Sequence, residues 1–195
     1  QDCLSLSVNQ SFNRITVDGD TSTNDACTLS ATNQSGVQLR DCLKDFQIAL
    51  NELTKTLAHM IVRDGEGATK FVEIRTSGLD TDEDCLEVAY TVAHSPLVKT
   101  ALFASDANWG RILAAVGRSK VNGLVIENIN IYLNNLPIIT AGELDKQYTE
   151  EAGSVEMSKS EIVIRIEMGK SSSSESVWTT DLSYDYVKIN AEYRS

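Results

Sequence analysis

The sequence predicts an α+β fold, a sandwich in which helices cover mixed sheets. Apolar residues recur at helical spacing over residues 36–62, whereas residues 126–133 and 161–168 alternate apolar and polar side chains as strands do. The two patterns are interspersed without the regular βαβ alternation of a doubly wound parallel sheet. With 195 residues, of which 42% are apolar, we expect residues 1–195 to form a single domain with a substantial core.

The first third of the chain predicts two helices separated by a loop and a strand. Helical spacing indicates a helix over residues 1–14, small polar residues indicate a loop over 16–25, and weak alternation indicates a strand over 26–32. The long helix over 36–62 has one apolar stripe, which we expect to be buried. The stripe consists of Leu39, Leu43, Phe46, Leu50, Leu53, Leu57 and Met60.

Capping residues mark three later helix starts. After a strand over 70–77, Thr81 or Asp80 caps one helix, and Ser95 before a proline caps another. Ser183 caps the last helix. The apolar side of that last helix consists of Tyr184, Val187, Ile189 and Tyr193.

Strands dominate the final third. Alternation predicts strands over 126–133, 137–140, 161–168 and 176–180, with a short helix over 148–158. The serine-rich residues 171–174 indicate a hairpin loop, so we expect the last two strands to pair with each other.

Composition excludes several classes of protein. The formal net charge of −11 argues against a non-specific nucleic-acid binder, which needs cationic phosphate contacts. No apolar run has the length of a membrane span, and no signal-peptide pattern is present. The four cysteines form no C-x-x-C pair, which indicates reduced thiols in a cytoplasmic protein and no metal site. They are Cys3, Cys27, Cys42 and Cys85.

The most informative stretch is the corner over residues 63–70, Arg-Asp-Gly-Glu-Gly-Ala-Thr-Lys. Glycines on both sides of Glu66 would let its carboxylate be aimed into a site. The alternative is a helix C-cap, with Glu66 pointing to solvent. The sequence contains no phosphate-binding loop, no nucleophile elbow and no complete calcium or zinc motif.

Two further polar stretches accompany this corner. Residues 12–25 contain Asp18, Asp20 and Asp25, which we expect to hold the loop through side-chain bonds to backbone amides. Residues 95–112 include Asn108, Trp109 and Arg111. These three could line a cleft, or they could start a helix, with Trp109 in the core and Arg111 as a buried or interface ion-pair partner.

Taken in order, these three stretches and the tail over 190–195 resemble the ornithine acetyltransferase family, the glutamate N-acetyltransferases of arginine biosynthesis. The resemblance covers essentially the whole chain, with Ala107 standing where many members carry proline. It implies a layered α/β/β/α sandwich and a precursor that cleaves itself before a threonine. The chain looks like the β subunit without its first residues, so the nucleophilic threonine would lie upstream of Gln1.

The resemblance implies a reaction and a set of site residues. An N-terminal threonine would take the acetyl group of N-acetylornithine, and glutamate would then accept it; some relatives also use acetyl-CoA. No other cofactor is implied. Glu66, Asn190 and Ser195 resemble the family's substrate contacts, whereas no residue of this chain is expected to be the nucleophile. Asn190 could equally be a helix-surface residue and Ser195 a frayed terminus.

The resemblance also implies partners and leaves rival functions open. We expect an α subunit from the same precursor, an α2β2 heterotetramer, small-molecule substrates, and neither a nucleic acid nor a membrane as a partner. One rival is a self-processing aminopeptidase of the same fold, in which water replaces glutamate. The other is a non-catalytic binding subunit.

Overall fold

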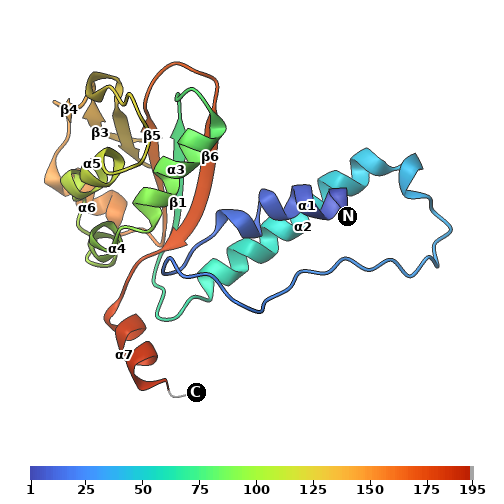
Figure 1. Cartoon of the computed structure of the whole chain (residues 1–195). Helices are drawn as coiled ribbons and strands as arrows, with labels where there is room; N and C mark the ends of the chain where they lie inside the picture. Colours follow the sequence, from blue (N-terminus) through green and yellow to red (C-terminus); the bar gives the residue numbers. More distant parts are fainter. Residues whose placement is uncertain (194–195) are drawn as a thin grey trace.

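The computed structural model describes residues 1–193, in which helices cover one face of a mixed sheet (Figure 1). The predicted α+β class is therefore confirmed, with one sheet in the described part. Its helices are α1 (Asp2–Asn9), α2 (Leu43–Arg63), α3 (Asp82–Ala93), α4 (Pro96–Phe103), α5 (Trp109–Gly117), α6 (Glu150–Met157) and α7 (Tyr184–Glu192), with short 3-10 turns at Phe12–Arg14, Leu39–Asp41 and Ile126–Asn128. Its strands are β1 (Phe71–Ser77), β2 (Asn130–Leu133), β3 (Leu136–Thr140), β4 (Glu143–Leu144), β5 (Glu161–Glu167) and β6 (Ser174–Thr180).

The sheet has the strand order β4-β3-β2-β5-β1-β6. β1 runs parallel to β5, with Ile74 opposite Ile164, and antiparallel to β6. The apolar side chains of these strands form one core with helices α3 to α6, in which Ile74, Ile164, Val88 and Ile112 are buried. The opposite face carries ion pairs such as Arg75–Glu73, and next to α2 it carries a small apolar cluster that includes Val62, Phe71 and Trp178.

Local capping signals were predicted correctly. The hydroxyls of Thr81, Ser95 and Ser183 each accept a hydrogen bond from a backbone amide in the first turn of α3, α4 and α7 respectively. These starts could be predicted because the donor and the acceptor lie within three residues of each other.

Three predictions were wrong, two of which depend on distant contacts. Residues 26–32 form no strand in the described structure. The strands over 161–168 and 176–180 do not pair, because β1 lies between β5 and β6. The predicted helix over 1–14 ends at Asn9 and is followed by a separate 3-10 turn.

The apolar stripe of α2 is largely exposed, contrary to expectation. Leu50 is buried, but Leu53 and Met60 are 55% and 59% exposed. The buried residues of α2 are Leu50, Thr54, Ala58 and Val62, a neighbouring face. α1 and α2 pack together and project from the β6 side of the sheet (Figure 1). The apolar side of α7 is exposed as well, with Tyr184 at 83% and Val187 at 59%.

Candidate active site

The corner over residues 63–70 is a tight turn that leaves Glu66 at its exposed tip. α2 ends at Arg63, and the amide of Ala68 donates to the carbonyl of Gly65 (N–O 3.0 Å). Gly67 has φ +65°, a conformation that favours glycine. The corner therefore ends a helix and leaves Glu66 exposed, as the C-cap reading expects, whereas the reading in which Glu66 is aimed into a site stays a prediction.

The start of α7 packs directly on this corner. Ser183 Oγ donates to the carbonyl of Gly67 (2.7 Å) and accepts from the amide of Tyr186 (3.2 Å). A Cβ atom on Gly67 would lie 2.7 Å from both Ser183 Oγ and Tyr186 N. Glycine is therefore required here by space as well as by φ.

Asp181, at the end of β6, fixes the other side of the corner. Its side chain is buried, and Oδ1 accepts from the amides of Thr69 (2.8 Å) and Lys70 (3.0 Å) and from Thr180 Oγ1 (3.0 Å). Oδ2 accepts from the hydroxyl of Thr69 (2.6 Å). One carboxylate thus joins residues that are more than a hundred positions apart.

Lys99 connects the stretch over 95–112 to residues 179–182, at the end of β6. Its buried ammonium donates to Thr179 Oγ1 (2.9 Å) and to the carbonyl of Thr180, while its own carbonyl accepts from the amide of Leu182 (3.2 Å). Burial lowers the pKa of Lys99 to about 8, and the nearby carboxylates of Asp181 and Asp18 oppose that shift.

Lys70 is the second buried lysine near Asp181. Its ammonium donates to Ser105 Oγ (2.8 Å) and to the carbonyl of Met157. Burial lowers the pKa of Lys70, and the charge of Asp181 opposes the shift.

The loop over 16–20 completes the arrangement. Tyr186 donates its hydroxyl to Asp18 Oδ2 (2.9 Å), and Asp18 Oδ1 accepts from the amide of Asp20 (2.9 Å) as predicted. Burial and this bond to Asp18 raise the pKa of Tyr186 to about 12, with smaller contributions from the charges of Asp18, Glu66 and Asp20. All three polar stretches of the sequence therefore meet around residues 179–186.

Two of the three predicted substrate-binding residues, Glu66 and Asn190, lie on elements that adjoin residues 179–186. Glu66 and Asn190 belong to elements that touch through Gly67 and the start of α7. The side chain of Asn190 donates to the carbonyl of Tyr186 in its own helix (3.0 Å). Ser195 lies outside the described residues. The substrate-binding roles of Glu66, Asn190 and Ser195 remain predictions.

Asn108, Trp109 and Arg111 take the helix-start role. Asn108 Oδ1 accepts from the amide of Arg111 (3.2 Å), and Trp109 packs against the core. The guanidinium of Arg111 donates to the carbonyl of Leu97 (2.9 Å), and no carboxylate among residues 1–193 pairs with it, so only the interface form of the expected ion pair stays a prediction.

Sequence reasoning missed Asp181, Lys99 and Lys70 as members of the candidate site. Asp181 had a local signal, because it stands between a β-like run and the N-cap Ser183. The two lysines had none, since charged residues are mostly exposed and only the tertiary structure buries these.

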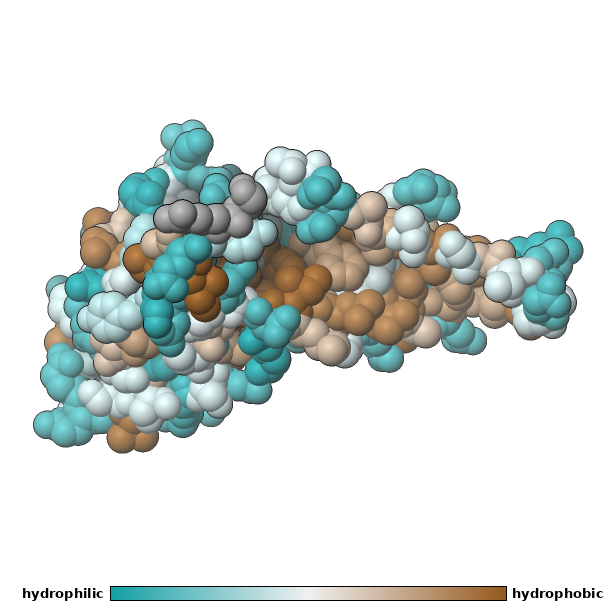
Figure 2. All heavy atoms as spheres, turned by 90° about the horizontal axis from the view of Figure 1, so that it is seen from below, coloured by the Kyte–Doolittle hydropathy of each residue, from teal (hydrophilic) through white to brown (hydrophobic). Residues whose placement is uncertain are grey.

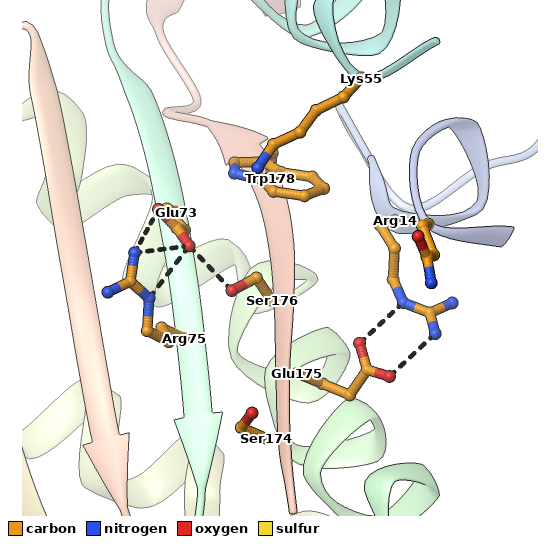
Figure 3. A pocket seen from close by; sticks show the side chains of 9 residues that line it. Arg14, Lys55, Glu73, Arg75, Ser174, Glu175, Ser176 and Trp178 are labelled. Carbon is orange, nitrogen blue, oxygen red and sulfur yellow. Dashed lines mark hydrogen bonds and ion pairs between the residues drawn. The ribbon is translucent and has the colours of Figure 1, made fainter. Parts of the chain in front are cut away.

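A separate open cleft of about 490 Å³ lies between α1, α2 and the face of the sheet opposite the core. Figure 3 shows that its charges pair with one another: Arg14 binds Glu175 through two hydrogen bonds (3.0 and 3.1 Å), and Arg75 binds Glu73. The ammonium of Lys55 lies over the ring of Trp178. Because its carboxylates are already neutralised and neither Glu66 nor Asn190 lines it, this cleft is not our candidate site.

Two kinds of feature are absent from residues 1–193. No three His, Cys, Asp or Glu side chains in this range are grouped so as to hold a metal ion. No helix in the same range combines the length and apolarity of a membrane span.

Gly67→Ala tests the contact between the corner and α7. The added methyl would meet Ser183 Oγ and Tyr186 N, whereas Gly123, also at positive φ (+76°), has nothing within 4 Å of such a methyl. We expect Gly123→Ala to cost roughly 1–2 kcal/mol of unfolding free energy through backbone strain, and Gly67→Ala roughly 1–3 kcal/mol more through overpacking. Urea unfolding measures both, and equal losses would contradict the close packing.

Lys99→Met tests the burial of the Lys99 ammonium. The folded-state pKa of about 8 lies below the ordinary lysine pKa of 10.5, so between these two pH values the unfolded chain holds a proton that the folded chain has released. The free energy of unfolding of the unmodified protein should therefore gain roughly 2–3 kcal/mol relative to Lys99→Met between about pH 7.5 and 10.5. Lys188→Met, at an exposed position of α7, is the control and should show no such trend. A pH-independent difference for Lys99→Met would rule out the lowered pKa.

Comparison with known proteins agrees with this architecture. The ArgJ family model matches residues 1–195. Proteins named arginine biosynthesis bifunctional protein ArgJ from Pseudomonas syringae pv. tomato and Psychrobacter arcticus are 52% and 53% identical, and each match covers 100% of this chain and 49% of the relative. The chain thus spans about half the length of these curated relatives.

A solved structure agrees as well. The crystal structure of arginine biosynthesis bifunctional protein ArgJ from Bacillus halodurans superposes with a TM-score of 0.92 at 36% identity. The match covers 99% of this chain and 92% of the solved chain. The resemblance inferred from the sequence motifs is confirmed, and the chain belongs to the ArgJ family.

Proposed function

We propose that this chain is the β subunit of an acetyltransferase that moves the acetyl group of N-acetylornithine to glutamate. One observation carries the proposal: the three polar stretches converge on residues 179–186 and leave Glu66 at the exposed tip of a rigid corner. Membership of the ArgJ family and the names of its relatives support the assignment to arginine biosynthesis.

The proposed chemistry needs a nucleophile that lies upstream of Gln1 in the precursor. An N-terminal threonine has a hydroxyl that attacks and an amine that accepts its proton. Attack on the acetyl carbonyl breaks the amide bond, releases ornithine and leaves an acetyl ester on threonine. The amine of glutamate then attacks this ester, which releases N-acetylglutamate and restores the hydroxyl. Acetyl-CoA is a second possible donor, and the reaction requires no other cofactor.

The role proposed for Glu66 follows from charge. N-acetylornithine carries a side-chain ammonium, and a fixed carboxylate binds such a group well when it need not reorganise. The charges of Asp18, Glu66 and Asp20 all raise the pKa of Tyr186, which shows that these carboxylates lie near one another. The surroundings of the proposed site are therefore negative. Asn190 and Ser195 are proposed to contact the amino-acid part of the substrate.

The proposed partner is the α subunit of the same precursor, in a cytoplasmic α2β2 assembly. The chain spans 49% of its curated relatives but 92% of the solved chain from Bacillus halodurans, as expected if the relatives' length is divided between two chains. Exposed apolar residues on α2 and α7 also favour a partner of this kind.

Glu66→Gln tests the proposed site in the enzyme produced from the full-length precursor. Loss of the charge should lower kcat/KM for N-acetylornithine roughly 10–100-fold, because a hydrogen bond to a charged group contributes about 1.5–3 kcal/mol. Asp64→Asn removes a neighbouring exposed charge from the same corner and should change kcat/KM less than about threefold. Unchanged transfer in Glu66→Gln would overturn the role of Glu66.

The same preparation distinguishes the proposed reaction from its rivals. Ornithine release should depend on glutamate, and intact-mass measurement should find an α chain together with a β chain that starts with threonine. Ornithine release without glutamate would indicate a hydrolase instead. A single polypeptide without transfer activity would indicate a non-catalytic protein.

A further inference from the structure

Residues 26–32 have the sequence of a strand but lack a strand to pair with. Cys27, Leu29 and Ala31 alternate with threonine and serine, which is a strand pattern. In the structure every residue from 18 to 41 is exposed, and the backbone of residues 26–34 makes no hydrogen bond within the described part of the chain. Figure 1 shows this segment running outward from the sheet along the arm to its outer end, where α2 begins.

A strand-forming segment of this kind is suited to pairing with another sheet. Its amides and carbonyls are available along its whole length, and an extended peptide adds readily to an exposed sheet edge. The chain's own sheet does not take it up. The nearest pairing is the isolated bridge between Ile15 and Trp178 on β6, which ends before the segment begins.

The apolar stripe of α2 is the second unpartnered feature of the same region. Leu43, Leu53, Leu57 and Met60 are between 42% and 59% exposed, although their spacing is that of a core-facing helix. Figure 2 shows the corresponding apolar surface along the projecting arm. A row of exposed apolar side chains along one helix face is typical of a protein interface.

We propose that residues 26–32 pair with an edge strand of the second polypeptide and that the α2 stripe packs on the same polypeptide. This proposal rests on the proposed function, which supplies that polypeptide as the α subunit. About half of the relatives' length lies outside this chain, enough for a domain with its own sheet. A second copy of this chain is a poorer occupant, since each copy carries a net charge of −11.

Photo-crosslinking tests which surface meets residue 29. A photo-reactive amino acid at position 29 of the full-length precursor should link this chain to the α subunit. The same probe at position 144, an exposed leucine on β4, should not. A link between two copies of this chain, or no link at position 29 when the α subunit is present, would overturn the pairing alone. Absence of any second chain in the intact-mass measurement would overturn the proposed partner as well.

Proline substitution tests whether the contact is a backbone ladder. Ser30→Pro removes one backbone amide donor from the centre of the segment, so one hydrogen bond of a strand ladder could no longer form there. It should weaken association of the two chains about 10-fold or more, the equivalent of one lost hydrogen bond. Gln38→Pro, also in exposed extended backbone but outside the segment, should change association less than about twofold. Equal effects of the two substitutions would overturn the strand pairing.

Discussion

The buried carboxylate of Asp181 holds together the parts of the chain that form the proposed site. It accepts four hydrogen bonds, three of them from Thr69 and Lys70 in the corner that presents Glu66. Two residues further on, Ser183 bonds the same corner and caps α7. The positions of the Glu66 tip and of the last helix therefore depend on one short segment that follows β6.

Three buried charged groups, those of Asp181, Lys70 and Lys99, lie around this segment. Asp181 is buried near the ammonium groups of Lys70 and Lys99. Burial lowers the pKa of each lysine, and the charge of Asp181 partly opposes that shift. Each of the three charges would be costly if buried without the others, because a single buried ion has no compensation. The arrangement therefore favours one geometry of the corner over looser alternatives.

The sequence determined local structure far better than long-range pairing. Caps at Thr81, Ser95 and Ser183 depend on residues three positions away, so they could be predicted. The Asp181–Thr69 contact and the place of β1 between β5 and β6 depend on residues about a hundred positions apart. The strand predicted over 26–32 and the burial predicted for the α2 stripe were also wrong, and both features belong to the interface proposed above. The convergence of the motifs around Glu66 followed from family resemblance and not from spacing.

Amide hydrogen exchange of Thr69 and Lys70 tests the role of Asp181 most directly. Both amides donate to Asp181 Oδ1, whereas the next amide, that of Phe71, donates to the carbonyl of Ser160. In Asp181→Ala we predict that Thr69 and Lys70 exchange roughly 10-fold faster or more, while Phe71 stays protected. Unchanged protection of Thr69 and Lys70 in Asp181→Ala would show that this carboxylate does not hold the corner.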